Sequence, residues 1–98
     1  MEKKIALKVH DSDNVATIFE NDIEAGMDIT VHDKKGNEEV IKSLSTIPYG
    51  HKIALRDIHP GELIIKYGEE IGGATAEIKK GEHVHDHNEE SLRGRGDL

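Results

Sequence analysis

Apolar and polar residues alternate with a period of two over several short stretches of this chain. Residues 5–10 read Ile-Ala-Leu-Lys-Val-His, and residues 27–32 read Met-Asp-Ile-Thr-Val-His. This alternation is typical of a strand with one buried face, here the face of Ile5, Leu7 and Val9 in the first stretch. The turn-forming residues 33–37 then predict a hairpin. Residues 63–67 are more uniformly apolar, which favours a more fully buried strand.

One segment departs from this pattern. Asp11-Ser12-Asp13-Asn14 offers several side chains that cap helices, directly before Val15, Ile18 and Phe19. Their i, i+3, i+4 spacing predicts a short amphipathic helix, the only substantial one in the chain.

A four-residue pattern, Ile-x-x-Gly, recurs at 23–26, 47–50, 58–61 and 78–81. In each copy an apolar residue precedes a glycine, which can adopt positive φ without steric cost, and an extended segment follows. The pattern predicts four equivalent turns in a compact, rolled-up β structure. The spacing is too irregular for a solenoid.

Composition narrows the possible partners. The chain has 98 residues, a formal net charge of −7 and no basic stripe, so nucleic acid and anionic membranes are unfavourable partners. Its apolar runs are too short for a signal peptide or a membrane span, and we expect a cytoplasmic protein. Because cysteine is absent, a metal site must use nitrogen and oxygen ligands. So short a domain also lacks room for a deep, enclosed active site, which makes a partner plausible.

Three histidines fall in the run Gly81-Glu82-His83-Val84-His85-Asp86-His87-Asn88. If this run is extended, His83, His85 and His87 project from one face. Neutral imidazole is the commonest protein ligand for borderline divalent metals, and a His-x-His spacing can place two ring nitrogens on one ion. The alternative is a solvated polar tail, and the histidines alone do not decide between the two.

Several motifs give the chain a resemblance to a known family. They lie at 13–16 (Asp-Asn-Val-Ala), 47–55 (Ile-Pro-Tyr-Gly-His-Lys-Ile-Ala-Leu), 64–72 (Ile-Ile-Lys-Tyr-Gly-Glu-Glu-Ile-Gly), 81–88 and 91–97. Together they resemble the SAF domain of the altronate/galactarate dehydratase family. The resemblance implies a mainly β, SAF-type β-clip fold of short bent strands and hairpins with one short α-helix over residues 1–90, and a flexible tail at 91–98.

In that family the domain is either fused to a large catalytic region or encoded as a small subunit. The resemblance therefore implies a large catalytic dehydratase subunit as partner, with homo-oligomers also possible. It implies a hydro-lyase that eliminates water from a sugar acid, most simply altronate, to give a 2-keto-3-deoxy acid, with Fe²⁺ or Mn²⁺ as metal. The isolated chain is then expected to be inactive. Two alternatives are the small subunit of a sulfolactate sulfo-lyase and a stand-alone module that binds a sugar acid or a metal.

The resemblance also suggests roles for individual residues. His85 and His87 are the expected metal ligands, whereas His83 is expected to pack or to be exposed. The candidates for substrate binding are Asn88, His51, Lys52, Asp13, Asn14, Arg93 and Arg95. For Asp13 and Asn14 the alternative role is to cap the predicted helix. For Arg93 and Arg95 the alternative is a contact with the partner subunit.

Overall fold

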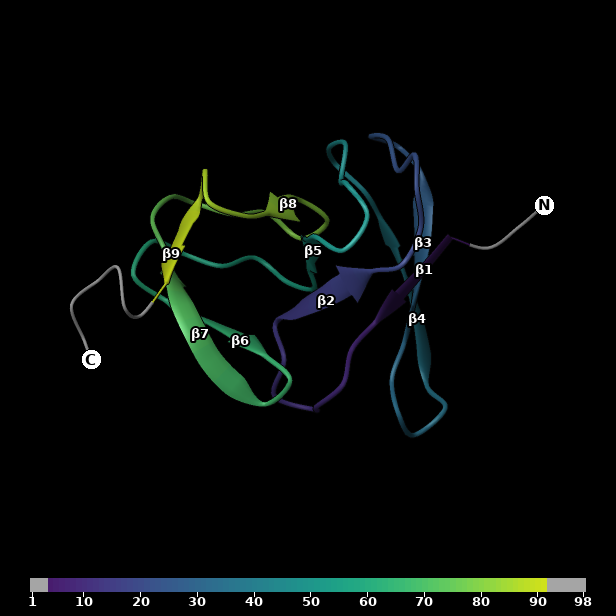
Figure 1. The fold of residues 1–98 in the computed structure, drawn as a ribbon, viewed down its shortest axis with the longest axis horizontal. Coiled ribbons are helices and arrows are strands. Elements are labelled where there is room, and N and C mark those ends of the chain that lie inside the picture. The colour runs from purple at the N-terminus through teal and green to yellow at the C-terminus, as the bar shows by residue number, and fades with distance from the viewer. Residues whose placement is uncertain (1–3, 92–98) are drawn as a thin grey trace.

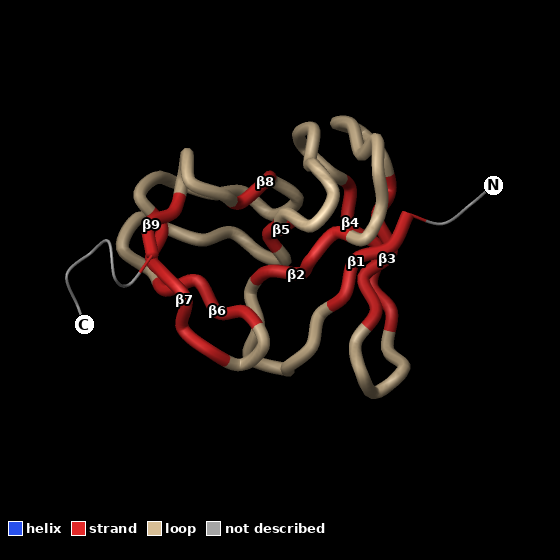
Figure 2. Tube along the Cα trace, viewed as in Figure 1, coloured by secondary structure: helices blue, strands red, loops and turns tan. Residues whose placement is uncertain are grey.

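A computed structural model describes residues 4–91 as nine short strands joined by turns (Figures 1 and 2). The strands are β1 (Lys4–Leu7), β2 (Val15–Ile18), β3 (Asp28–His32), β4 (Glu38–Lys42), β5 (Lys52–Ala54), β6 (Leu63–Lys66), β7 (Glu69–Ala74), β8 (His83–Val84) and β9 (Glu89–Ser91). The mainly β class is confirmed, and the curled sheet fits a β-clip. Within this range, no helix is long and apolar enough to cross a membrane.

The strands form two sheets. Six of them lie in the order β4-β3-β1-β2-β5-β8, and the other three in the order β6-β7-β9. All pairings are antiparallel except that of β1 with β3. Figure 1 shows β2 and β5 between the smaller sheet on the left and the β1-β3-β4 layer on the right. Strand β5 thus lies centrally and pairs with β8, which carries the first residue of the histidine run.

Two hydrophobic cores lie on either side of β2 and β5. Ile18 and Ile53 belong to the first core, whereas Val15 and Ala54 belong to the second. Successive side chains of a strand point to opposite faces, so these two strands contribute to both cores. Burial on both faces holds the strand pair rigidly, which matters because β5 follows directly after His51.

The four Ile-x-x-Gly segments form equivalent turns, as the sequence predicts. Their isoleucines are buried and pair across the molecule as two isolated bridges, Ile23 with Ile47 and Ile58 with Ile78. Every glycine of the four segments has positive φ, between 82° and 93°. The repeated sequence therefore encodes paired turns that fasten the ends of the short strands.

Gly81 should tolerate substitution least among these glycines. A Cβ atom at Gly81 would overlap the carbonyl oxygen of Lys42, whereas one at Gly61 would meet open space. Both have nearly the same φ, +93° and +88°. We expect Gly61→Ala to lower the free energy of unfolding by about 1 kcal/mol, from backbone strain alone, and Gly81→Ala by about 3 kcal/mol. Urea melts measure both, and equal losses would contradict the close approach.

The predicted helix after Asp11–Asn14 is wrong. Val15–Ile18 forms β2, paired with β1 and β5, and residues 4–91 contain no helix. β-Branched side chains at three of these four positions favour a strand, and burial of the whole strand outweighs the local capping signal. The helical spacing to Phe19 is coincidental, because Phe19 lies beyond the strand and is exposed.

Two predicted strands are present, but the residues that they bury differ from those expected from the sequence. In β1 it is Ala6, not Ile5 or Leu7, that is fully buried, because this inner strand packs its Ala6 face against the first core. Strand β6 buries only Ile64 completely, and Tyr67 lies outside it with an exposed side chain. The hairpin between β3 and β4 is confirmed.

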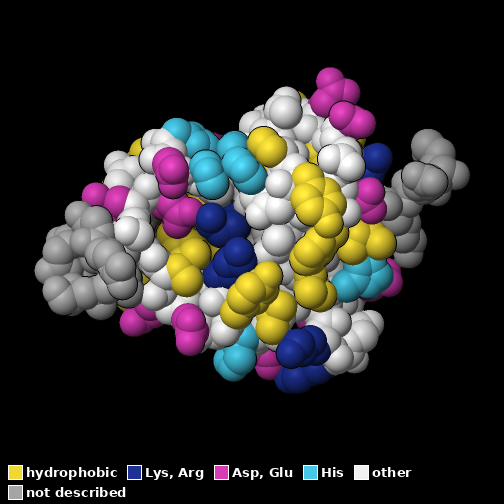
Figure 3. All heavy atoms as spheres, viewed as in Figure 1, with side chains coloured by type: hydrophobic (Ala, Val, Ile, Leu, Met, Phe, Trp, Pro, Cys, Tyr) yellow, Lys and Arg dark blue, Asp and Glu magenta, His cyan; other side chains and the backbone are white. Residues whose placement is uncertain are grey.

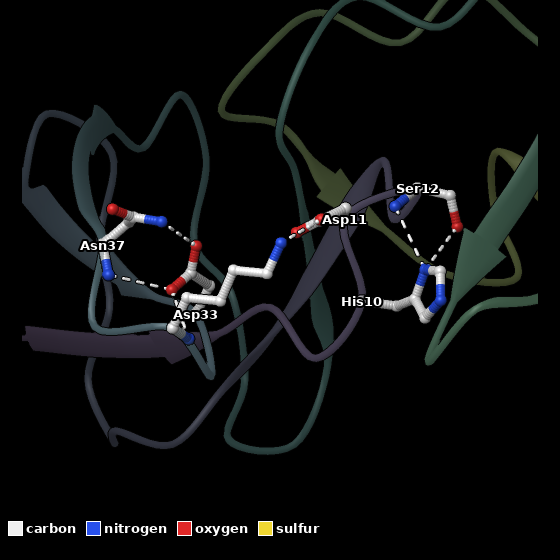
Figure 4. A network of polar contacts seen from close by, with 6 residues as sticks. His10, Asp11, Ser12, Asp33 and Asn37 are labelled. Carbon is white, nitrogen blue, oxygen red and sulfur yellow. Dashed lines mark hydrogen bonds and ion pairs between the residues drawn. The ribbon is translucent and has the colours of Figure 1, made fainter.

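A polar network fastens this β3-β4 hairpin to the loop between β1 and β2 (Figure 4). One Asp33 carboxylate oxygen accepts hydrogen bonds from the backbone N–H groups of Lys35 and Asn37, 2.8 Å each. Hydrogen bonds from Asn37 lower the pKa of Asp33. Lys35 Nζ reaches Asp11 Oδ2 at 2.6 Å, which lowers the pKa of Asp11 and raises that of Lys35. These groups are exposed, so the network fixes the conformation of the two loops and does not form a buried site.

Candidate metal centre

Strands β5 and β8 bring two distant segments together. Their register pairs Lys52 with Val84 and Ile53 with His83. His51 immediately precedes β5, so its ring lies beside the start of the histidine run although the two are 32 residues apart. Figure 3 shows histidine side chains gathered on one surface over β8, with basic side chains next to them.

Three imidazole rings form a compact cluster, His51, His83 and His85. His51 Nδ1 lies 2.8 Å from His83 Nε2, and the rings of His51 and His85 stack with centroids 3.9 Å apart. One ring nitrogen from each residue lies within 4.8 Å of the others. The exposed ring of His87 lies beside the cluster, 4.9 Å from that of His83. We call His51, His83 and His85 the histidine cluster.

Asn88 holds two members of the cluster in place. Its Oδ1 accepts the backbone N–H of His85 at 3.0 Å, and its Nδ2 donates to the carbonyl oxygen of His83 at 2.8 Å. The backbone N–H of His83 donates to Ser45 Oγ at 3.0 Å. Strand β8 ends at Val84, and a turn follows in which Asn88 and Glu89 donate to the carbonyl of His85. The rings therefore meet through a turn, not through the strand alternation that the sequence suggested.

A nearly buried ion pair joins the two halves of the site. Lys52 Nζ lies 2.7 Å from Glu89 Oε1, and their side chains are only 11% and 9% exposed. Lys52 follows His51, and Glu89 directly follows the turn that carries His85. The pair also links β5 of the larger sheet to β9 of the smaller one. It is therefore placed to fix the separation between His51 and His85.

Burial and neighbouring charge favour the neutral form of two members of the cluster, His83 and His51. Burial lowers the pKa of His83 from 6.5 to about 4, and the nearby His87, His51 and His85 add to the effect. Burial is also the main cause that lowers the pKa of His51, and the nearby His85 and Lys52 lower it further. Neutral imidazole has a free ring nitrogen, and it is the form that binds a metal.

The lowered pKa of His83 predicts a loss of stability on mild acidification. Between pH 6.5 and about 4 the unfolded chain binds a proton at His83 that the folded chain does not. Protons therefore favour unfolding, and the free energy of unfolding should fall as the pH drops through this window. Urea melts at pH 7, 5.5 and 4.5 with a chelator present measure the fall. The fall should be smaller for His83→Gln than for the wild type, and identical slopes in the two proteins would contradict this account.

The cluster fits a divalent transition metal. His85 Nδ1 is buried without a hydrogen-bond partner, which is costly for a polar atom and leaves it available as a ligand. Metal–nitrogen bonds of about 2.1 Å place neighbouring ligand nitrogens about 3 Å apart, near the present distance between His51 Nδ1 and His83 Nε2. Imidazole ligands suit iron, zinc, copper and nickel. Small ring movements would bring the three nitrogens around one ion.

Asp13 and Asn14 bond to backbone groups outside the cluster and join the two sheets. Asn14 is fully buried; its Oδ1 accepts the backbone N–H of Ile65 and its Nδ2 donates to the carbonyl of Leu63, both at 2.8 Å. Asp13 accepts from Val9 and His10 through one oxygen and from Gly68 through the other. These contacts show a structural role for both side chains; their predicted contact with substrate stays a prediction.

Sequence reasoning identified part of this constellation. His85, His51, Lys52 and Asn88 lie in or next to the cluster, although Lys52 and Asn88 bind protein groups here. His83, expected to pack or to be exposed, is half-buried inside the cluster. Ser45 and Glu89 were missed; Ser45 comes from the loop after β4 and Glu89 from β9, and only the tertiary arrangement brings them to the cluster. Arg93, Arg95 and the tail after Ser91 lie outside the described residues.

The fold and site define an all-β domain that carries surface imidazoles suited to a metal. Residues 4–92 match the family described as altronate/galactarate dehydratase SAF domain, and this chain belongs to that family.

Relatives of two sizes resemble the chain. It is 39% identical over 88 residues to (2R)-sulfolactate sulfo-lyase subunit alpha of Chromohalobacter salexigens, a match that covers 87% of this chain and 93% of that protein. It is also 39% identical to altronate dehydratase and to galactarate dehydratase (L-threo-forming) of Escherichia coli. Those matches cover 84% and 80% of this chain but only 15% and 14% of the dehydratases. The domain thus occurs both in a subunit of its own size and within much longer enzymes.

Proposed function

We propose that this chain is the small subunit of a metal-dependent lyase that acts on a hydroxylated carboxylic acid, with altronate as the leading substrate. The histidine cluster carries the proposal, because it gathers three imidazoles at the surface of a domain shared with dehydratases. Membership of a dehydratase and lyase family supports the reaction class. The proposed metal is Fe²⁺, with Mn²⁺ as a possible replacement.

The proposed reaction is a β-elimination. The C–H bond next to the carboxylate and the C–O bond of the β-hydroxyl break, a C=C bond forms, and the hydroxyl leaves as water with one added proton. The resulting enol becomes the 2-keto-3-deoxy acid. A bound divalent metal supplies Lewis acidity toward the hydroxyl or carboxylate oxygens.

The residues of this chain would hold and orient rather than transfer the proton. His51, His83 and His85 would bind the metal, and His87, whose ring lies beside that of His83, is the candidate for a fourth ligand. Asn88 and the Lys52–Glu89 pair would keep the imidazoles in position, since near-ångström placement of ligands governs the rate. The proton acceptor is expected from the partner, because so small a domain cannot surround the substrate alone.

A second candidate is the small subunit of a sulfolactate sulfo-lyase, in which a C–S bond breaks and sulfite leaves. The match over 93% of such a subunit favours it specifically. Both candidates share the cluster and differ in the leaving group. A stand-alone binding module is the third possibility, and it requires no catalytic partner.

One reconstitution experiment separates these candidates. The chain is assayed alone and with the co-expressed large lyase subunit of the same organism, on altronate, galactarate and sulfolactate, with Fe²⁺ or Mn²⁺. We expect no turnover by the chain alone and elimination by the pair. Release of a 2-keto acid without sulfite identifies a dehydratase, and sulfite release identifies the sulfo-lyase. Turnover by the purified chain alone, or none by the pair on any substrate, would overturn the proposal.

A further inference from the structure

Exposed aromatic side chains border the histidine cluster. Phe19 and Tyr49 are 42% and 56% exposed, and their rings meet edge to face with centroids 6.2 Å apart. Tyr49 lies two residues before His51. Phe19 follows Ile18, whose backbone N–H donates to the carbonyl of His51 at 2.9 Å. The aromatic pair therefore lies directly beside the segment that places His51.

A third aromatic residue extends this surface. Tyr67 is 47% exposed, and its hydroxyl lies 3.3 Å from Thr17 Oγ1, on the strand position that pairs with Lys52. Its φ of 57° is uncommon for a bulky residue and belongs to a tight hairpin turn with Gly68. Figure 3 shows hydrophobic, basic and histidine side chains on one face of the molecule. We call Phe19, Tyr49 and Tyr67 the aromatic face.

We infer that the aromatic face is the docking surface for the large catalytic subunit, which covers the histidine cluster when it binds. This inference rests on the proposed function. Aromatic residues are enriched at the centres of protein interfaces, where burial of a large ring stabilises the complex and the tyrosine hydroxyl still finds a partner. Three such rings lie next to the proposed metal site. They offer apolar area that a partner could bury, and a partner bound there would also cover the histidine cluster.

The relatives indicate which partner occupies this face. The domain makes up only 15% of the Escherichia coli altronate dehydratase, so most of that protein lies outside it. A relative of matching size is by name a subunit. A large subunit docked on this face would cover the histidine cluster.

Val40 offers a matched control. Among residues 4–91 it is the most exposed large hydrophobic residue, at 61%, and it lies on β4, the edge strand opposite to β8 in the six-stranded sheet. If exposure of apolar area alone governed binding, Val40 would contribute as much as the aromatic face. We expect Val40 to contribute little to the affinity for the large subunit.

The test measures the affinity of the full-length chain for the large lyase subunit of the same organism, by isothermal titration calorimetry. We expect Phe19→Gln/Tyr49→Gln to weaken the complex at least tenfold and Val40→Gln to change it less than twofold, with similar thermal melts for all proteins. If the wild-type complex forms and the double variant binds equally well, the inference is overturned while the proposed function stands. If the wild-type chain binds no large subunit, the proposed function itself fails. Analytical ultracentrifugation of the chain alone tests whether a second copy occupies this face. A dimer that the double variant abolishes would assign the face to a second copy and overturn the inference.

Discussion

Alanine at His51, His83 or His85 should weaken Fe²⁺ and Mn²⁺ binding about a hundredfold or more, while the domain stays folded. Loss of residues that merely support a metal ligand costs 10- to 100-fold in affinity, so loss of a ligand should cost no less. The three ring nitrogens lie within 4.8 Å of one another, and each variant removes one of them. Anaerobic titration of the chain against a competing chelator measures the affinity.

Two further histidines serve as controls for this titration. His59 is exposed and bonded to Glu77 at 2.7 Å, so His59→Ala should bind metal like the wild type. His87→Ala tests the remaining predicted ligand, whose ring lies beside His83, and a smaller but measurable loss would make it the fourth ligand. Wild-type affinity in all three cluster variants would show that the imidazoles do not hold the metal.

Lys52→Met should lower the free energy of unfolding by about 3–5 kcal/mol. The change leaves the Glu89 carboxylate buried without its cation, and an uncompensated buried charge is strongly destabilising. The double variant Lys52→Met/Glu89→Leu removes both charges and should recover most of the loss. Urea melts of Lys52→Met, Glu89→Leu and the double variant together give the coupling energy of the pair.

The exposed pair Lys35–Asp11 is the matched control. Its Nζ to Oδ2 distance of 2.6 Å resembles that of Lys52 to Glu89, but both its side chains are about two-thirds exposed. Solvent screening should make Lys35→Met cost much less than Lys52→Met. If Lys52→Met costs no more than Lys35→Met, the buried pair does not stabilise the site.

The turns and hairpins could be predicted from sequence because their signals are local. The Ile-x-x-Gly pattern names both a buried anchor and a glycine with positive φ, and the structure has both in all four copies. The failure at Val15–Ile18 has the opposite origin. Capping residues and helical spacing are also local signals, but the strand is fixed by pairing with β1 and β5, which the local sequence does not reveal.

The site followed the same division. Strand alternation suggested that the rings of the histidine run share one face, but the run turns after Val84 and the rings meet through that turn. The side-chain amide of Asn88 bonds to the backbone of His83 and His85. The union of His51 with His83 depends on the register of β5 against β8, a long-range pairing. From the sequence, Lys52 was expected to be a cation available to a substrate. Its ion-pair partner Glu89 lies 37 residues further along the chain, so the local sequence does not reveal the pair.

The most direct test is X-ray diffraction from crystals of the chain bound to the large subunit, recorded at the absorption edge of the bound iron or manganese. The account predicts an anomalous peak about 2.0–2.3 Å from ring nitrogens of His51, His83 and His85. A metal peak held entirely by the large subunit, with the hydrogen bond between His51 Nδ1 and His83 Nε2 intact, would contradict it.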